Sequence, residues 1–455
     1  MNIKFTLKVA MIVGLTVILM IPLMMIKGVV NERSWFRDNV KADIAQSWTG
    51  TQKVLGPVLI VPYVERYKKK EWDANLKIYK ENTYYKNKQV FILPDKLSIN
   101  GEITTEERTR GIYSIPVYSS KLSVEGAFTN EQLVKLHKKK NSKLTWKKPY
   151  VSMLVSDIRG ISVQPKIQWS HETFEFSSGS GLEHWDNGMH AELSKLKFKN
   201  IKQYPFSFKI NLKGMESIQF APVGKTTEVN IKANWPHPSF IGRYLPNQRT
   251  ITNNAFDSNW KISSFSSDMP RLINACQNGN CNDFVNNTFG VALINSVDVY
   301  HKTERSVKYA ILFISLTFIT FFLFEIMKEL RLHPMQYLLV GLSLTFFYLL
   351  LISLTEHMSF HNAYAIAAIA NISVISIYIS AVLKSRHRAL GFASMLVLLY
   401  AMLYAILVSE DNALLMGSLL FFVILSLVMI ITRKLDWYQV TDKLAKQAVQ
   451  KDDKS

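Results

Sequence analysis

The chain has 455 residues, 48% of them hydrophobic, and a mean hydropathy of +0.06. That value is high for a soluble protein and low for a transporter made only of helices and short loops. It therefore indicates a chain that combines a polar part with an apolar part. The net charge of +19 does not indicate nucleic-acid binding, because the lysines are scattered, with only short runs at 68–70 and 138–140, and no nucleic-acid-binding motif accompanies them. We expect no nucleic-acid partner.

The first apolar run covers residues 9–26 and follows Lys4 and Lys8. Its basic start resembles a signal sequence. The run is longer than the apolar region of an ordinary signal, and no small-residue cleavage site follows it. We therefore expect an uncleaved membrane anchor within residues 1–30.

Residues 31–306 are polar and predict a β-rich domain. Apolar and polar residues alternate, as at Phe206, Phe208, Ile210 and Leu212, with the period of half-buried strands. The fold class expected here is mostly β, sandwich-like or barrel-like, with helices at 32–47 and 130–139. Further strand-like runs are 54–64, 89–93, 111–116, 152–155, 206–212, 229–233 and 291–299.

Two features stand out in this domain. Cys276 and Cys281 flank an Asn-Gly pair that favours a turn, so a disulfide is expected, with a free pair as the alternative and no metal site. The second feature is a proline-rich loop at 235–246. It is either a rigid loop packed on the β core, or a recognition loop or contact with the membrane helices. Its candidate residues are Trp235, Pro236, His237, Pro238, Ser239, Phe240, Gly242 and Pro246.

Five more apolar runs follow, each long enough to cross a bilayer: 309–327, 337–354, 363–383, 390–408 and 413–432. Lys and Arg follow the second, fourth and sixth of the six runs, and such residues in short loops mark the cytoplasmic side. We expect a five-helix bundle at 307–432, a cytoplasmic tail at 433–455, a cytoplasmic N-terminus and a periplasmic domain at 31–306.

Few polar groups accompany these runs. Glu325 is expected to reach the membrane interface, and Asn371 to form a hydrogen bond across helices near mid-membrane. One hypothesis is that the residues at the external helix ends form an ionic cluster with Arg305 and Lys308, and that this cluster couples the bundle to the domain. Those residues are Glu356, His357, Glu410 and Asp411. The alternative is that they are ordinary charges at helix ends. The polar positions considered are Glu325, His333, Glu356, His357, Asn371, Glu410 and Asp411.

No phosphate loop, zinc motif or hydrolase nucleophile motif is present, so we expect no enzymatic activity and no cofactor. The first hypothesis is a non-enzymatic envelope protein whose domain binds a lipid, a peptidoglycan component or another envelope protein. One alternative is a transporter or flippase working through the five helices. The other is a hydrolase at the membrane interface, with His237 and His357 as its best candidate bases.

Several stretches together resemble one known family. They are Gly-Pro-Val-Leu-Ile-Val-Pro-Tyr at 56–63, Trp-Pro-His-Pro-Ser-Phe at 235–240, His-Pro-Met-Gln-Tyr-Leu-Leu-Val-Gly at 333–341, Glu-His at 356–357 and Glu-Asp at 410–411. The chain is similar to the CreD-like family of bacterial inner-membrane proteins, described as cell-envelope integrity or colicin-tolerance proteins. The resemblance implies an inner-membrane location and a role in envelope homeostasis and stress response. It implies no established catalytic residues, and residues 65–205 do not take part in it.

Overall fold

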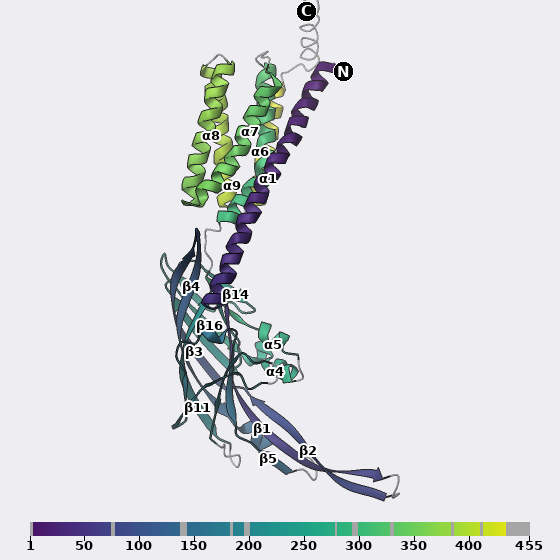
Figure 1. Cartoon of the computed structure of the whole chain (residues 1–455), viewed down its shortest axis with the longest axis vertical. Helices are drawn as coiled ribbons and strands as arrows, with labels where there is room; N and C mark the ends of the chain where they lie inside the picture. The colour runs from purple at the N-terminus through teal and green to yellow at the C-terminus, as the bar shows by residue number, and fades with distance from the viewer. Residues whose placement is uncertain are drawn as a thin grey trace, which may run out of the picture. The chain divides into compact units, whose positions relative to one another are not determined.

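A computed structural model describes residues 3–73, 78–136, 143–182, 185–194, 201–277, 280–293, 299–327, 332–383, 386–409 and 413–433 (Figure 1). The chain divides into two compact units. Residues 1–38 and 297–455 form one, called here the helical unit. Residues 39–296 form the other, called here the β unit.

Helix α1 runs from Ile3 to Ser47 and belongs to both units, changing from the helical unit to the β unit after Asp38. The anchor and the helix expected at 32–47 are therefore one continuous helix. The sequence between them contains Gly28 but no proline, so no helix breaker stronger than a single glycine separates them. From Asn39 onward the helix belongs to the β unit. There Val40, Ile44 and Trp48, which follows the helix end, pack in one hydrophobic cluster.

The β unit contains two sheets. The first is ordered β14-β17-β12-β1-β6-β10-β9, with β2 and β5 also paired to β1. Its strands are β1 (Gln52–Asp73), β2 (Ile78–Ile92), β5 (Lys143–Trp146), β6 (Tyr150–Val155), β9 (Ser177–Ser178), β10 (Gly188–Glu192), β12 (Ser217–Phe220), β14 (Pro238–Gly242) and β17 (Phe289–Leu293).

The second sheet is ordered β15-β16-β13-β3-β4-β11-β7-β8. It is antiparallel except for the β13–β3 pair. Its strands are β3 (Lys96–Arg110), β4 (Tyr113–Thr129), β7 (Lys166–Trp169), β8 (Glu172–Glu175), β11 (Gln203–Met215), β13 (Thr226–Ala233), β15 (Gln248–Ile251) and β16 (Phe256–Ser263).

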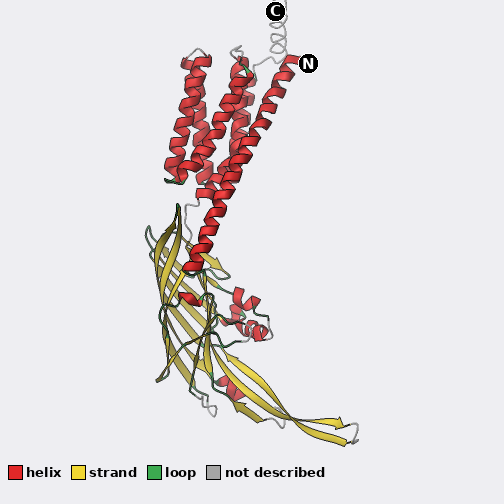
Figure 2. Ribbon diagram, viewed as in Figure 1, coloured by secondary structure: helices red, strands yellow, loops and turns green. Residues whose placement is uncertain are grey.

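Buried side chains from both sheets form one continuous core, as expected of two layers packed face to face. Alternation dictates which residues enter it: Phe206, Phe208, Ile210 and Leu212 of β11 are all buried. Figure 2 shows how strands dominate this unit, which confirms the β-rich domain expected from the sequence. The architecture is a β-sandwich.

Short helices complete the β unit: α2 (Glu131–Lys135), the 3₁₀ turn η1 (Ile158–Gly160), α3 (Ser264–Ser267), α4 (Met269–Gln277) and α5 (Asn282–Asn286). The helix expected at 130–139 is shorter than predicted, because α2 ends at Lys135 and residues 137–139 lie outside the described part. The strand expected at 291–299 is β17, which ends at Leu293; residues 294–298 also lie outside.

The helical unit contains α1 and α6 (Val299–Met327), α7 (Pro334–Thr355), α8 (Phe360–Leu383), α9 (Arg386–Val408) and α10 (Ala413–Thr432). Among the described residues, five helices are long and apolar enough to cross a membrane: α1, α6, α7, α8 and α9. The sixth expected span, 413–432, coincides with α10, several of whose side chains fall outside the description. Aromatic rings fill the centre of this unit, with Phe347, Tyr364 and Tyr400 in mutual edge contact.

Candidate functional site

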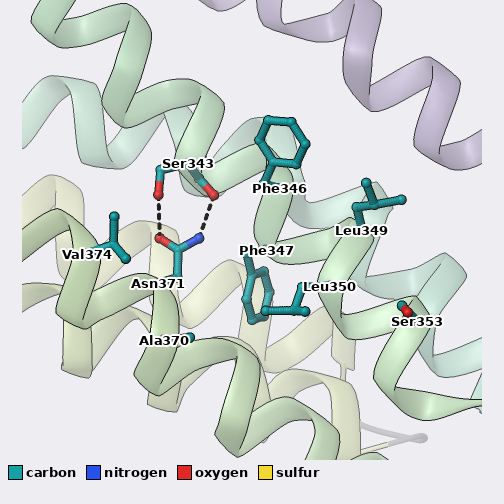
Figure 3. A pocket seen from close by; sticks show the side chains of 9 residues that line it. All are labelled: Ser343, Phe346, Phe347, Leu349, Leu350, Ser353, Ala370, Asn371 and Val374. Atoms are coloured by element: carbon teal, nitrogen blue, oxygen red, sulfur yellow. Dashed lines mark hydrogen bonds between the residues drawn. The ribbon is translucent and has the colours of Figure 1, made fainter. Parts of the chain in front are cut away.

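A groove of about 460 Å³ lies along α7 and α8 in the helical unit (Figure 3). Most of its walls are apolar, and Phe346 and Val374 are 60% exposed beside it. Its polar groups are serines and one amide, and among the described residues no carboxylate or cation lines it. The lining residues are Ser343, Phe346, Phe347, Leu349, Leu350, Ser353, Ala370, Asn371 and Val374.

Asn371 is the most polar side chain of the groove and is buried. Its Nδ2 donates to the backbone carbonyl of Ser343, and its Oδ1 accepts from the Ser343 hydroxyl at 3.2 Å (Figure 3). The hydrogen bond expected across helices is thus present. Because both ends of the amide are engaged, this pair ties α8 to α7.

Glu325, near the end of α6, is the centre of a second polar network. Its residue is only 4% exposed, so its side chain faces the neighbouring helices, and the expectation that it reaches the membrane interface stays a prediction. Its carboxylate accepts from the Lys8 ammonium of α1, from the Leu332 amide at 2.9 Å and from the Tyr337 hydroxyl at 2.9 Å. Three donors compensate the burial of this charge, because each of its oxygens has partners.

His333 caps the helix that follows this network. Its Nδ1 accepts from the Met335 amide, while the Gln336 side chain accepts from the His333 amide at 2.9 Å. Pro334 occupies the first turn, where a missing amide hydrogen costs nothing. The His-Pro-Met-Gln stretch of the family resemblance is therefore a capping box that starts α7.

Gly341 accounts for the end of that same stretch. A β-carbon built there would lie 2.3 Å from Leu19 Cδ1 and 2.8 Å from Phe318 Cζ. Only a residue without a side chain lets α7 pack this closely against α1 and α6. The polar network and the glycine thus hold the same three helices together.

The described charged residues of the hypothetical ionic cluster bond to partners other than one another. Glu356, which ends α7, pairs with Arg33 of α1 at 3.2 Å. Arg305 donates to the carbonyls of Ile406 and Ser409, at the end of α9. Lys308 pairs with Glu304 on its own helix. His357 is exposed, and Glu410 and Asp411 lie outside the described residues.

The loop at 235–246 is an edge strand closely packed on the core. β14 pairs with β17, with Pro238 opposite Leu293. Phe240 contacts the rings of Phe256 and the fully buried Trp260. Trp235 Nε1 donates to the backbone carbonyl of His237 at 3.2 Å, and His237 is exposed.

Gly242 ends β14 with φ +95°, and a β-carbon there would lie 2.2 Å from the Thr288 carbonyl oxygen. Tyr244 follows, accepting from Trp260 Nε1 through its carbonyl and donating its hydroxyl to the Ser266 carbonyl. These contacts favour the interpretation of a rigid loop packed on the core. Ser239, Pro236 and Pro246 are only partly exposed within it.

The predicted disulfide is present between Cys276 and Cys281, at the end of α4 and just before α5. The Asn-Gly turn expected between them falls on residues 278–279, outside the described part. Among the described residues, no group of three or more His, Cys, Asp or Glu is placed to hold a metal ion.

The sequence did not predict the hydrogen bonds that the side chain of Arg159 donates to the C-terminal end of α1. Arg159 donates to the carbonyls of Ala45 and Gln46 at 3.1 and 2.7 Å, where the helix leaves carbonyls unpaired. The same guanidinium binds both oxygens of Asp157, and this hydrogen bonding holds the pKa of that carboxyl below its usual range. The one sequence signal was the Asp-Ile-Arg-Gly run, which is typical of a helix N-cap.

It also missed an arm formed by β1 and β2. Beyond Arg66, β1 pairs with β2 alone among the described strands, as far as the Asp73–Ile78 pair. Figure 2 shows this two-stranded ribbon running out of the sandwich. The Lys68–Lys70 run lies in it, and exposed aromatic residues accompany the lysines.

Comparison with known proteins gives one consistent result. The family model described as inner membrane protein CreD matches residues 4–438. The inner membrane protein CreD of Escherichia coli (strain K12) is 35% identical over 434 residues, which cover 95% of this chain and 93% of that protein.

The similar solved structures are only weakly similar to this chain. An M1 zinc metallopeptidase of Deinococcus radiodurans aligns over 37% of this chain and 39% of its own, with 9% identity and a TM-score of 0.19. Another structure of that enzyme gives 8% identity, coverage of 37% and 38%, and a TM-score of 0.18. Likeness this weak supports no statement about fold or function. The family match over nearly the whole chain does, and it shows that this chain belongs to the CreD family of inner membrane proteins.

Proposed function

We propose that this chain is a non-enzymatic inner-membrane protein that supports cell-envelope integrity. Its β unit, on the periplasmic side, binds an envelope component, and its helical unit anchors that domain. The envelope role rests on the family resemblance. The orientation rests on the Lys and Arg residues that follow alternate apolar runs, which favours both termini in the cytoplasm.

The observation that carries the anchor role is the pairing of polar side chains within the helical unit. Glu325 bonds to Lys8 and Tyr337, and Asn371 bonds to Ser343. In a transporter, intramembrane polar groups mark the substrate path and must exchange partners. Here they join neighbouring helices, as polar groups that stabilise a bundle do.

Three versions of the chain, each expressed in cells that lack the native gene, test this function. The first is the full chain, the second replaces residues 39–296 by a short linker, and the third holds residues 39–296 at the membrane with an unrelated anchor. The third should restore resistance to envelope-active agents, and the second should not. Restoration by the second alone would refute the proposal.

The orientation has its own test. Cysteines placed singly at the exposed positions Lys80 and Lys232, in a variant with Cys276→Ser and Cys281→Ser, should react with a membrane-impermeant maleimide in intact spheroplasts. A cysteine at Arg433 should react only after lysis. Labelling in the opposite order would place the β unit in the cytoplasm and exclude a periplasmic binding role.

The groove on α7 and α8 supports the second candidate function, a lipid transporter or flippase. Its size suits part of an acyl chain, and Asn371 supplies a polar group beside it. Asn371→Leu separates the two functions. An anchor should keep full activity in the cell assay at unchanged protein level, whereas a flippase should lose it. Ser380→Leu on the same helix, outside the groove, is the matched control.

The non-enzymatic character also has a direct test. His237 and His357 are the best candidate bases for an interfacial hydrolase, and both are exposed. His237→Ala and His357→Ala should each leave the cell phenotype unchanged. If either variant lost resistance to envelope-active agents at a normal protein level, a hydrolase would become the preferred function.

A further inference from the structure

The arm formed by β1 and β2 has two unlike faces. Its register opposes Arg66 with Tyr85, Lys68 with Thr83, Lys70 with Glu81 and Trp72 with Tyr79. Because side chains alternate along a strand, these pairs share one face, called here the cationic face. The pairs between them, such as Tyr67 with Tyr84, share the opposite face.

The opposite face is occupied by its own contacts. Glu65 pairs with Lys88 at 2.7 Å. Glu71 accepts from the Tyr84 hydroxyl, from Lys69 and from Asn82, and the first of these bonds contributes most to lowering the pKa of that carboxyl. The Tyr67 and Tyr84 rings stack with their centroids 5.8 Å apart. The carboxylates of Glu65 and Glu71 on this face thus already have cations and donors.

The cationic face presents its rings outward. Trp72, Tyr79 and Tyr85 are 56%, 69% and 68% exposed. Trp72 and Tyr79 meet edge to face with their centroids 5.1 Å apart and form one platform. Large aromatic residues left this exposed in a lysine-rich ribbon are typical of a recognition surface rather than of a core.

Charge on this face is unbalanced. Arg66, Lys68 and Lys70 lie on it, and Glu81 is its one carboxylate among the described residues, paired with Lys68 at 2.9 Å. Residues 66–88 contain eight Lys or Arg and three Asp or Glu. The ribbon therefore carries net positive charge, which attracts an anionic partner at moderate ionic strength.

The spacing of rings and cations selects a linear partner. Trp72 and the Arg66–Tyr85 pair lie six residues apart, roughly 20 Å at about 3.3 Å per residue. Lys68 and Lys70 fall between them. A chain of rings could lie along the strand, stack at both ends and place its anionic groups on the lysines. A bilayer would instead need its apolar anchors together and its cations at their border.

We propose that the cationic face of the β1–β2 arm binds an anionic glycan strand of the cell envelope, with its sugar rings on the aromatic residues and its carboxylates on Arg66, Lys68 and Lys70. This inference rests on the proposed function, because it requires the β unit to lie outside the cytoplasm. The disulfide between Cys276 and Cys281 agrees with that compartment and disfavours a nucleic acid as the partner.

The test uses the full chain in detergent and purified peptidoglycan sacculi as the anionic glycan, with co-sedimentation as the measurement. Lys68→Ala with Lys70→Ala should weaken binding about fivefold at low salt and reduce its salt dependence. Trp72→Ala should weaken it about tenfold, and Trp72→Tyr should restore most of it.

The matched control is Lys80→Ala with Lys86→Ala, which removes the same charge from the same ribbon on the opposite face. It should leave binding within about twofold of the unsubstituted chain, because Debye screening limits the effect of distant charge. Equal weakening by both double variants would overturn the proposal in favour of net charge alone.

Two further outcomes would overturn it. Binding of anionic lipid vesicles but not of sacculi would make the bilayer the partner. Equal binding of single-stranded RNA, sensitive to the same variants, would show an unselective polyanion surface. The spheroplast labelling described above distinguishes failure of this inference from failure of the proposed function. A β unit labelled outside with no arm-dependent binding refutes this inference alone, whereas a β unit inside refutes the proposed function.

Discussion

The two units use buried polar groups in different ways. In the β unit, Ser120, Ser152 and Tyr118 are buried and donate to the backbone carbonyls of Leu212, Ser180 and Ser217. In the helical unit, the Glu325 carboxylate and the Asn371 amide bond to other helices. The β unit also buries the Glu65 carboxylate, but its partner Lys88 lies on a strand that is already joined to it by backbone hydrogen bonds. Helices have no backbone hydrogen bonds between them, so a buried charge or amide helps to select which helices pair.

The difference teaches where function is expected. The β unit presents charged and aromatic groups on its outer surface, as the arm shows. The helical unit engages Glu325 and Asn371, its most polar buried groups among the described residues, in holding the bundle together. Under the proposed function we expect recognition by the first unit and anchoring by the second.

The largest expected effect is in the β core. Trp260→Ala removes a fully buried ring that contacts Phe240 and Phe289 and donates to the Tyr244 carbonyl. It should lower the free energy of unfolding by about 3–5 kcal/mol. The thermal midpoint of the β signal in circular dichroism measures this. Phe265→Ala, at a fully exposed ring, is the control and should shift stability by less than about 0.5 kcal/mol.

A slightly smaller effect is expected in the helical unit. Glu325→Ala leaves Lys8 without its partner and removes the acceptor of the Tyr337 hydroxyl, so the bundle should lose about 3 kcal/mol. Its thermal midpoint in detergent measures the loss. Glu356→Ala breaks an ion pair with Arg33, which is 43% exposed, and should cost at most about 1 kcal/mol. Equal losses would show that burial does not distinguish the two pairs.

The smallest effect concerns pH. Hydrogen bonding to Arg159 lowers the pKa of Asp157 in the folded state. The carboxylate therefore adds stability above its unfolded pKa of about 3.9, and this contribution is lost as the pH falls through the lower folded value. Asp157→Asn should be less stable than the unsubstituted chain near pH 7, and the difference should shrink below about pH 4. A difference independent of pH would exclude the linkage.

Much of this protein follows from its sequence alone. Six apolar runs, alternating loop charges and period-two strand patterns depend only on local composition, because a bilayer selects length and hydropathy and a half-buried strand selects alternation. The β-rich domain, the disulfide and the hydrogen bond of Asn371 across helices were all predicted in this way.

Contacts between distant residues were decided only by the tertiary structure. Glu325 looks like an interfacial acid until Lys8, more than three hundred residues away, is placed beside it. His333 and Gly341 are conspicuous in the sequence, but only packing shows that one starts α7 and the other admits Leu19. The arm looks like scattered lysines until the register of β1 with β2 sorts them onto two faces. Local pattern fixes which elements form, while pairing across the chain decides which side chains meet, because that depends on every other element being in place.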